Sequence, residues 1–572
     1  MTEPRASGGA EDRGTPVPAV WEIASADPAA VSALAAAGIP ESVARILAGR
    51  GVVDPDAARE FLSPSLDRTP DPFAMKGMEP AVDALVAAAR RGERIVVFGD
   101  YDVDGVTAVA QLRAVFRALG ADAVPFLPHR VRDGYGLKPE TFRKVFAEHR
   151  PRAIVTVDCG ITAVEAVAEA ARAGVAVVIT DHHLPPDVLP EGAAVVNPKQ
   201  PGCRYPFKEL CGSGVAFKIA QAIIRRERLT LSERSLAKVA ALGTIADIVP
   251  LVSENRAIVA EGLAALADPR APGLKALLAE AGIAGRAPTS EEVAFRVGPR
   301  LNAAGRLDTA DLALSVFEER DAERALGIAR ALSERNAERQ GHERRVVAEA
   351  RRRALGGGEP ADGIVIEADA GWPRGVLGIA ASRLAREFRC PVFLFALDGD
   401  RAVGSGRSIP GISIHGVFSE MREDFLEFGG HAQACGGTVP AGGFAAFRER
   451  ARALFRERLA SVDRRPTLAI DAEIPLGRVD GALAAGLEGL EPHGEGNPRP
   501  IFLARRMEAR ERRPVGEHGT RIVLSASGVS RRAIAWRLSG AIPDGLIDAA
   551  FHVRRDAWSG GVELEIVGVR PA

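Results

Sequence analysis

The stretch Val96-Val97-Phe98-Gly99-Asp100-Tyr101-Asp102-Val103-Asp104-Gly105 decides the fold of the first large domain. The apolar run that ends at Phe98 predicts a short buried strand, which a glycine terminates. Asp100, Asp102 and Asp104 then alternate, and residues two apart in extended backbone point the same way. Like charges held this close repel one another, so the three carboxylates predict a bound cation at the strand's end. The alternative is an acidic turn, where Asp-Gly is common.

Length and composition narrow the class of protein. A chain of 572 residues is too long for one core and predicts several domains. Five cysteines without a Cys-x-x-Cys pair argue against a thiolate metal site and fit a reduced, cytoplasmic setting. We expect no membrane span and no exported leader, because no long apolar run occurs. The net charge of −1 means that any contact with a polyanion must come from a local basic patch.

Strands and helices alternate between residues 95 and 179, which predicts an α/β domain with a mostly parallel sheet covered on both faces. We expect six segments in all. They are a disordered N-terminus (1–20), a small helical cap on the next domain's edge (21–74), the catalytic α/β domain (75–320), a long solvated connecting helix (321–355), a second α/β domain (356–465) and a C-terminal β-barrel (466–572). The barrel's expected strands are 468–470, 501–503, 521–525, 532–536, 549–553 and 562–567.

Further polar residues follow other expected strands. Asp158 comes after strand 153–157, and Asp181-His182-His183 comes after strand 175–179. Ligand groups of parallel sheets gather at the carboxyl ends of the strands, so we expect these side chains to meet the first aspartate cluster. Asp247 stands alone in an apolar stretch, where an unpaired charge is costly. A buried salt bridge is the alternative for Asp247, and a helix cap or core histidine is the alternative for His183.

Carboxylates and imidazole without thiolate suit Mn²⁺ or Mg²⁺ better than structural zinc. Five or six acids exceed the charge that one divalent ion needs, which indicates two ions bridged by a shared carboxylate. Two-metal sites hydrolyse phosphoesters or phosphoanhydrides. Because adjacent side chains in extended chain point apart, we expect one of His182 and His183 to bind metal and the other to face the substrate phosphate.

These motifs, in this order, resemble the DHH phosphoesterase superfamily, named for the Asp181-His182-His183 triplet. The resemblance implies that Asp102 and Asp158 serve one Mn²⁺, with Asp158 shared. It implies that the second ion is bound by Asp104, His182 and Asp247, and that His183 contacts the scissile phosphate. Pyrophosphatase members carry a metal-binding histidine where this chain has Phe98. That departure argues against a pyrophosphatase and suggests that Asp100 takes part in metal binding and catalysis.

Basic segments of the catalytic domain are candidates for phosphate binding, since arginine binds phosphate through paired hydrogen bonds. Surface ion pairs are the alternative. The candidates are Arg130, Arg132 and Tyr135 in one glycine-containing segment and Arg300, Asn302 and Arg306 in another.

The second α/β domain carries two glycine-rich motifs that resemble the substrate-binding DHHA1 domain of the superfamily's exonuclease and oligonucleotide-hydrolase branch. The resemblance implies that Arg407, Ser408 and His431, with Gly429 and Gly430, hold nucleotide phosphates. The C-terminal segment is rich in arginine and resembles an OB fold. Its aromatic residues are candidates for base stacking or for barrel core, namely Phe502, Trp536, Phe551 and Trp558.

The domain order as a whole resembles the exonuclease branch of the superfamily. That resemblance implies a 5′-to-3′ exodeoxyribonuclease that acts on single-stranded DNA, releases 5′-mononucleotides and serves recombination and repair. We expect single-stranded DNA as substrate, a helicase and a single-strand-binding protein as partners, and a monomer. Three alternatives stay open: an oligonucleotide or cyclic-dinucleotide phosphodiesterase, a pyrophosphatase, and a catalytically inactive replication scaffold.

Overall fold

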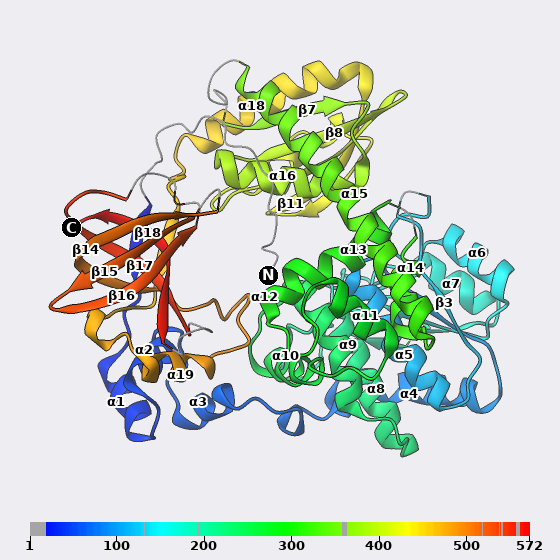
Figure 1. Ribbon diagram of the computed structural model, residues 1–572. Helices are drawn as coiled ribbons and strands as arrows, with labels where there is room; N and C mark the ends of the chain where they lie inside the picture. The colour runs from blue at the N-terminus through cyan, green and yellow to red at the C-terminus, as the bar shows by residue number, and fades with distance from the viewer. Residues whose placement is uncertain are drawn as a thin grey trace. The chain divides into compact units, whose positions relative to one another are not determined.

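The computed structural model describes residues 19–130, 132–192, 194–307, 309–356, 363–516, 519–536, 538, 542–555 and 561–572 (Figure 1). The expected disorder of the N-terminus falls almost wholly on residues 1–18, outside the described ones. The chain divides into two compact units. One comprises residues 64–462 and 492–498, and the other comprises residues 1–63, 463–491 and 499–572.

The first unit contains the expected parallel sheet. Its five strands lie in the order β3-β2-β4-β5-β6, and every neighbouring pair is parallel. The strands are β2 (Ile95–Gly99), β3 (Ala123–Phe126), β4 (Ala153–Val157), β5 (Ala176–Thr180) and β6 (Ala194–Val196). The chain runs from β2 outward to β3 and then returns to the other side of β2 as β4. The strand order therefore reverses between β2 and β4, which is where parallel sheets form their ligand crevice.

The period of two along the strands divides the core into two layers. Ile95 and Val97 of β2 join one cluster, which α4, α5 and α8 complete. Val96 and Phe98 join the opposite cluster, which α6 and α7 complete. Both faces of the sheet are covered, which explains why its strands are runs of Val and Ile. The covering helices are α4 (Met78–Arg90), α5 (Val103–Ala118), α6 (Pro139–His149), α7 (Val164–Arg172) and α8 (Gly212–Glu227).

A helical layer follows in the chain and leads to the long helix α15 (Ala322–Leu355). The layer consists of α9 (Glu233–Ala246), α10 (Ser253–Ala265), α11 (Pro272–Glu280), α12 (Ser290–Glu292), the π-helical turn Val293–Val297, α13 (Gly298–Leu307) and α14 (Asp311–Glu318). We expected α15 to be a solvated spacer, and this was wrong. Ala325, Ala329 and Leu332 form a buried stripe at helical spacing, and α15 packs on α11, α13 and α16 (Arg374–Phe388) (Figure 1).

The second sheet of this unit has the order β10-β11-β9-β8-β7, with only β7 and β8 parallel. Its strands are β7 (Val365–Asp369), β8 (Val392–Asp398), β9 (Arg401–Arg407), β10 (Glu427–His431) and β11 (Ala434–Pro440). Its helices are α16 (Arg374–Phe388), α17 (Ile414–Ser419) and α18 (Phe444–Leu459). This is the expected second α/β domain, and α16 covers one face of it.

The other unit is the expected barrel. Strands β14 (Phe502–Val515), β15 (Gly519–Ala526), β16 (Val529–Trp536), β18 (Val562–Pro571) and β17 (Leu546–Arg555) pair in that order, and β14 also pairs with β17, which closes the barrel. The segment expected as a strand at 468–470 is β12 (Thr467–Ile470), which pairs instead with β1 (Val20–Ile23) in a separate two-stranded sheet. No local pattern predicts that pairing, because the two strands are distant in sequence.

The N-terminal helices α1 (Pro28–Ala36), α2 (Glu41–Gly49) and α3 (Pro55–Leu62) pack into the core of the barrel unit, which the sequence did not predict. Residues 64–74 of the same expected cap belong to the unit of the catalytic domain, where Leu66 joins the core. Leu34, Ile46 and Leu47 share one core with α19 (Gly481–Glu488) and with barrel residues such as Phe551. The apolar faces of these helices pack against the barrel, and Arg50 forms an ion pair with Asp471.

A buried ion pair anchors α8 to α10. Lys218 and Glu254 are both 0% exposed, and Nζ lies 2.7 Å from Oε1. Tyr205 donates from its hydroxyl to the other oxygen of Glu254 at 2.6 Å, and Lys218 also donates to the carbonyl of Pro70 at 2.8 Å. Burial lowers the pKa of Lys218, and the Glu254 carboxylate opposes that shift. Each charge depends on the other, because neither can reach water.

We predict that Lys218→Met lowers the free energy of unfolding by about 3–5 kcal/mol, because it leaves the Glu254 carboxylate buried and unpaired. Urea unfolding followed by circular dichroism measures the loss. The double variant Lys218→Met/Glu254→Leu should recover most of it. A double variant that is as unstable as the sum of the single ones would show that the two charges do not act as a pair.

Candidate metal centre

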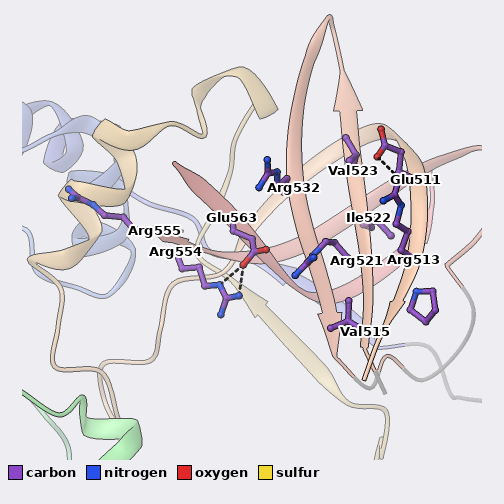
Figure 2. A pocket seen from close by; sticks show the side chains of 11 residues that line it. Glu511, Arg513, Val515, Arg521, Ile522, Val523, Arg532, Arg554, Arg555 and Glu563 are labelled. Carbon is purple, nitrogen blue, oxygen red and sulfur yellow. Dashed lines mark hydrogen bonds and ion pairs between the residues drawn. The ribbon is translucent and has the colours of Figure 1, made fainter. Parts of the chain in front are cut away.

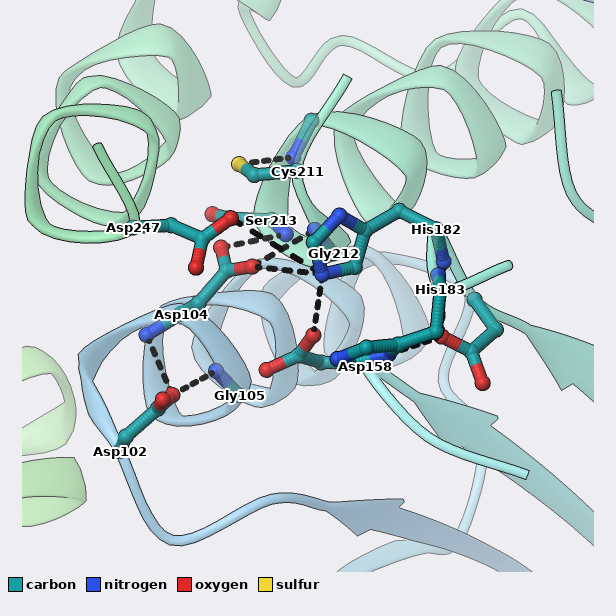
Figure 3. Close-up of polar contacts among 12 residues, drawn as sticks. Asp102, Asp104, Gly105, Asp158, His182, His183, Cys211, Gly212, Ser213 and Asp247 are labelled. Carbon is teal, nitrogen blue, oxygen red and sulfur yellow. Dashed lines mark hydrogen bonds and ion pairs between the residues drawn. The ribbon is translucent and has the colours of Figure 1, made fainter. Parts of the chain in front are cut away.

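The acidic residues meet at the reversal point between β2 and β4 (Figure 3). Asp100, Asp102 and Asp104 follow β2, and Asp158 follows β4. Asp158 has a left-handed backbone with φ +60°, an uncommon conformation for a residue other than glycine. A Cβ on Gly212 would lie 2.4 Å from the Cβ of Asp158, so the glycine at the start of α8 makes room for this carboxylate.

Three overlapping groups of side chains offer ligand atoms that lie within 4.8 Å of one another. The groups are Asp100, Asp102 and Asp158; Asp104, His182 and Asp247; and Asp158, His182 and His183. Nε2 of His182 lies 3.1 Å from Asp158, 3.8 Å from Asp247 and 3.9 Å from Asp104. Asp158 therefore belongs to two of the three groups and contacts His182 of the third, so its carboxylate is placed to serve two ions.

Backbone amides hold two of these carboxylates in place. Asp102 caps α5, and its Oδ1 accepts from the amides of Asp104 at 2.9 Å and Gly105 at 3.1 Å. Both oxygens of Asp104 accept amides at the start of α8, from Gly212 at 2.6 Å and Ser213 at 2.8 Å. The positive end of the helix dipole stabilises that charge. The two helix N-termini thus fix the carboxylates before any cation arrives.

The carboxylates of the site are crowded together, and too little positive charge lies beside them to balance theirs. Burial, followed by the charge of Asp102, raises the pKa of Asp100 well above its usual value and that of Asp104 to about 6. Burial, followed by the charge of Asp104, raises the pKa of Asp158 well above its usual value and that of Asp247 to about 7. Oδ1 of Asp100 and Oδ1 of Asp158 are buried without a hydrogen-bond donor among the described residues. Carboxylate oxygens and one imidazole with these features fit divalent cations.

The two histidines of the triplet have different surroundings. Burial lowers the pKa of His182, which favours the neutral imidazole that binds metals. Burial also lowers the pKa of His183, but the hydrogen bond and the charge of Asp181 outweigh it and raise the pKa. Nδ1 of His183 lies 2.7 Å from Oδ1 of Asp181 and 3.2 Å from the hydroxyl of Tyr135. His183 is thus held with its other ring nitrogen available to a substrate.

The role of Asp181 was not predicted from the sequence, which placed it in the Asp-His-His triplet without a function. Its oxygens accept from the amides of Ile161 at 2.9 Å, His182 at 2.7 Å and His183 at 3.1 Å. Together with the contact to the His183 ring, these hydrogen bonds occupy both oxygens of Asp181, so this carboxylate orients the two histidines. In the sequence, the position of Asp181 directly before the two histidines indicated this role.

Two arginines from separate segments, Arg130 and Arg306, interact with the acidic residues. Arg130 stacks over the Tyr101 ring at 4.7 Å, and its charge lowers the pKa of Asp100. Arg306 donates to the carbonyl of Gly375 at 3.1 Å, so α13 contacts the start of α16. Burial, followed by the charges of Arg130, Arg339 and Arg407, lowers the pKa of Arg306 to about 10. A cluster of guanidinium groups of this kind suits an anion such as a phosphate.

Other candidate residues lie in structural contacts. Arg300 donates to the carbonyls of Arg296 and Glu280 and to the Ser333 hydroxyl, which ties α13 to α11 and α15. Asn302 accepts from the amide of Val103 at 3.2 Å and so braces the aspartate loop. Ser408 donates to the carbonyl of Ile412 at 2.8 Å.

The remaining candidates are not members of the ligand groups. Arg132 is exposed, and its amide donates to Nδ1 of His129 at 3.1 Å. Gly429, Gly430 and His431 are exposed on β10, the edge strand of the second sheet. Trp536 lies in the barrel unit, and Trp558 lies outside the described residues.

Comparison with known proteins places these features in a family. The model of the N-terminal domain of the DHH family matches residues 94–244, that of the DHHA1 domain matches residues 361–457, and that of the RecJ OB domain matches residues 470–568. The single-stranded-DNA-specific exonuclease RecJ of Salmonella typhimurium is 34% identical over 93% of this chain and 92% of its own length. The chain belongs to the RecJ family.

Other RecJ proteins agree. RecJ of Thermus thermophilus is 37% identical over 89% of this chain and 72% of its own length. RecJ of Bacillus subtilis is 36% identical over 88% of this chain, which spans only 64% of the length of that relative. The crystal structure of T. thermophilus RecJ in complex with Mn²⁺ superposes with a TM-score of 0.84 at 32% identity and covers 97% of this chain and 80% of that chain. The expected α/β, DHHA1 and OB architecture is thereby confirmed. Within the described part of this RecJ-family chain, no helix is long and apolar enough to cross a bilayer.

We predict that metal removal destabilises the protein increasingly as the pH rises. The raised pKa values mean that the metal-free folded state binds more protons than the unfolded chain between about pH 4 and 7, so its stability falls through that window. Mn²⁺ replaces those protons, and at about 100 times its Kd it adds about 2.7 kcal/mol. Thermal unfolding with Mn²⁺ and with chelator should therefore differ by roughly 2–3 °C at pH 8 and by less at pH 5.

Asp247→Asn serves as the control for this measurement, because it removes one carboxylate with little change in volume. Its metal-dependent gain at pH 8 should shrink. An equal gain at pH 5 and pH 8 in the parent protein would contradict the role given to the raised pKa values.

Proposed function

We propose that this chain is a metal-dependent exodeoxyribonuclease that degrades single-stranded DNA from the 5′ end and releases 5′-mononucleotides. The observation that carries the proposal is the pair of ligand groups joined through Asp158 at the reversal point of the sheet. The names of the RecJ relatives, which are single-stranded-DNA-specific exonucleases, support the choice of substrate.

Two divalent ions, Mn²⁺ or Mg²⁺, fit the donor set. Asp100, Asp102 and Asp158 would hold one, and Asp104, His182 and Asp247 the other, with Asp158 shared. When bound, the ions neutralise charge at the phosphate and lower the pKa of water. The helix-capped Asp102 and Asp104 keep the ligand set rigid, so little reorganisation is needed when the substrate enters.

His183 and the arginines act on the phosphate itself. The Asp181 carboxylate keeps His183 protonated to higher pH, so its free ring nitrogen can donate a charge-assisted hydrogen bond to a phosphate oxygen. Arg130, Arg306 and Arg407 supply positive charge beside it, and Gly378 of α16 leaves the space that the Arg407 side chain occupies. Hydrolysis then breaks the P–O3′ bond, the oxygen of water joins phosphorus, and the leaving O3′ takes up a proton.

The barrel provides a second basic surface. A pocket of about 930 Å³ is lined by Glu511, Arg513, Pro514, Val515, Arg521, Ile522, Val523, Arg532, Arg554, Arg555 and Glu563 (Figure 2). Val523 pairs with Arg532 and Gly519 with Trp536, so the two-residue period puts Arg521, Arg532 and Trp536 on one face. Trp536 is 44% exposed, whereas Phe502 and Phe551 are buried in the core. An exposed indole beside arginines is how single strands are gripped without sequence preference.

The family resemblance extends the proposal to the cell. We propose that the protein acts in the cytoplasm in DNA recombination and repair, as a monomer that works with a helicase and a single-strand-binding protein. A domain dedicated to gripping long strands favours this role over hydrolysis of dinucleotides, which would not need it.

We predict that an oligonucleotide labelled at its 5′ end releases labelled mononucleotide at once in Mn²⁺, while a 3′-labelled one shortens progressively. Asp158→Ala should lower the rate about 10³-fold or more, because it removes the carboxylate that joins both ligand groups. Asp122→Ala is the matched control, since Asp122 is exposed and pairs with Arg94 at 2.8 Å. Release of label from the 3′ end first, or activity on dinucleotides alone, would contradict the proposal.

We also predict that Arg521→Ala/Arg532→Ala weakens binding to long single strands. The slope of the logarithm of the affinity against the logarithm of the salt concentration should become shallower by about 1.4, because each lost charge contributes about 0.7. Trp536→Ala should weaken binding with little change in that salt dependence, because it removes stacking. Fluorescence anisotropy with metal-free protein measures both. Arg478→Ala, an exposed arginine outside the pocket, should bind like the parent.

A further inference from the structure

The loop that follows Asp247 is held in an uncommon backbone conformation. Ile248 has φ +60° and Ser253 has φ +48°, so residues with left-handed backbone lie at both ends of the loop. Ile248 is branched at Cβ and 70% exposed, at a helix end where glycine or asparagine is usual. Left-handed backbone is strained at such a residue and persists only where surrounding contacts enforce it.

A segment from far along the chain supplies those contacts. Residues 492–498 lie between two parts of the barrel unit in sequence but belong to the compact unit of the metal centre. The carbonyl of Glu495 accepts from the amide of Leu251 at 2.7 Å. Gly494 and Gly496 face the same loop, because a Cβ on Gly494 would lie 2.6 Å from Leu251 Cδ1 and one on Gly496 would lie 3.1 Å from Pro250 Cβ.

The segment is itself rigidly braced. Gly494 and Asn497 exchange backbone hydrogen bonds of 2.9 and 3.1 Å, which close a tight turn with Gly496 at φ +69°. The buried Asn497 side chain donates to the carbonyl of Pro492 at 2.8 Å, and Arg256, only 1% exposed, donates to the same carbonyl at 3.2 Å. Ser290 donates to the carbonyl of His493.

The other side of the loop is held by α10 and by the segment that leads into α8. Asn255 of α10 donates to the carbonyl of Pro250 at 3.0 Å and to that of Glu209 at 2.6 Å. Glu209 lies three residues before Gly212, whose amide holds Asp104. The loop is therefore fixed between the segment of residues 492–498 and the start of α8.

We propose that Gly494, Glu495 and Gly496 are positioning residues for the metal ligand Asp247. They hold the strained loop so that the Asp247 carboxylate stays beside His182, although they touch neither metal nor substrate. The inference rests on the proposed function, because it takes Asp247 as a ligand. Contacts of this kind around a metal ligand change affinity by about 10–100-fold.

Gly496→Ala tests the proposal, because its Cβ would press on Pro250 and displace the loop. Mn²⁺ titration of metal-stripped protein, followed by electron paramagnetic resonance and calorimetry, should show one of two ions bound at least about ten-fold more weakly. Gly285→Ala is the matched control: Gly285 has φ +82° in the same unit, and an added Cβ meets nothing within 4 Å. The control should bind both ions like the parent and unfold at a similar temperature to Gly496→Ala.

Hydrogen exchange of the Leu251 amide gives a reading without metal, and it should be faster in Gly496→Ala than in Gly285→Ala. Asp247→Asn separates this inference from the proposed function. If Asp247→Asn weakens one ion while Gly496→Ala leaves both affinities and the Leu251 exchange unchanged, the positioning role is wrong and the metal centre stands. If Asp247→Asn binds both ions like the parent protein, Asp247 is not a ligand and the positioning role is wrong, whereas the exonuclease activity is decided separately by release of the 5′ label.

Discussion

The mutual repulsion of buried carboxylates at the reversal point of the parallel sheet is the constraint on which this structure depends. Asp100, Asp102, Asp104 and Asp158 follow two adjacent strands, and burial raises the pKa of three of them above their ordinary value. Two helix N-termini offset part of this repulsion, because their amides donate to Asp102 and Asp104. The remaining negative charge is left for cations to neutralise. Much of the surrounding architecture keeps those two helices in place.

The anchoring of α8 shows how far this requirement extends. The start of α8 carries the amides that bind Asp104, and its middle carries Lys218, which pairs with Glu254 of α10 in a region without water access. The same α10 carries Asn255 and Arg256, which fix the loop after Asp247 and the turn at residues 492–498. Helices α8 and α10 thereby connect Asp104 and the loop after Asp247, which belong to one ligand group, with the contacts that support them.

Local sequence patterns were sufficient to predict the parallel sheet and the place where the acidic residues gather. The alternation of buried strands and amphipathic helices predicted the parallel sheet, and alternate aspartates at a strand's end predicted where charge would gather, because both depend on short-range periodicity. The same reasoning missed the buried stripe of α15 and the packing of the N-terminal helices in the barrel core. In α15 the small residues Ala325 and Ala329 form a packing stripe that dense surface charge obscures. For α1 to α3 an apolar face shows that a helix packs, but not on which domain.

The sequence by itself determined the ligand types, their order and the strand ends that carry them, because these follow from residue chemistry and from the geometry of extended chain. Only the tertiary structure decided which carboxylates form a group, how His183 differs from His182, and that Arg300 holds helices together while Arg306 joins the cationic cluster. These depend on contacts between residues tens to hundreds of positions apart. The opening stretch therefore predicted a cation site, and the approach of α8, of Asp158 and of the loop braced by residues 492–498 gave that site its form.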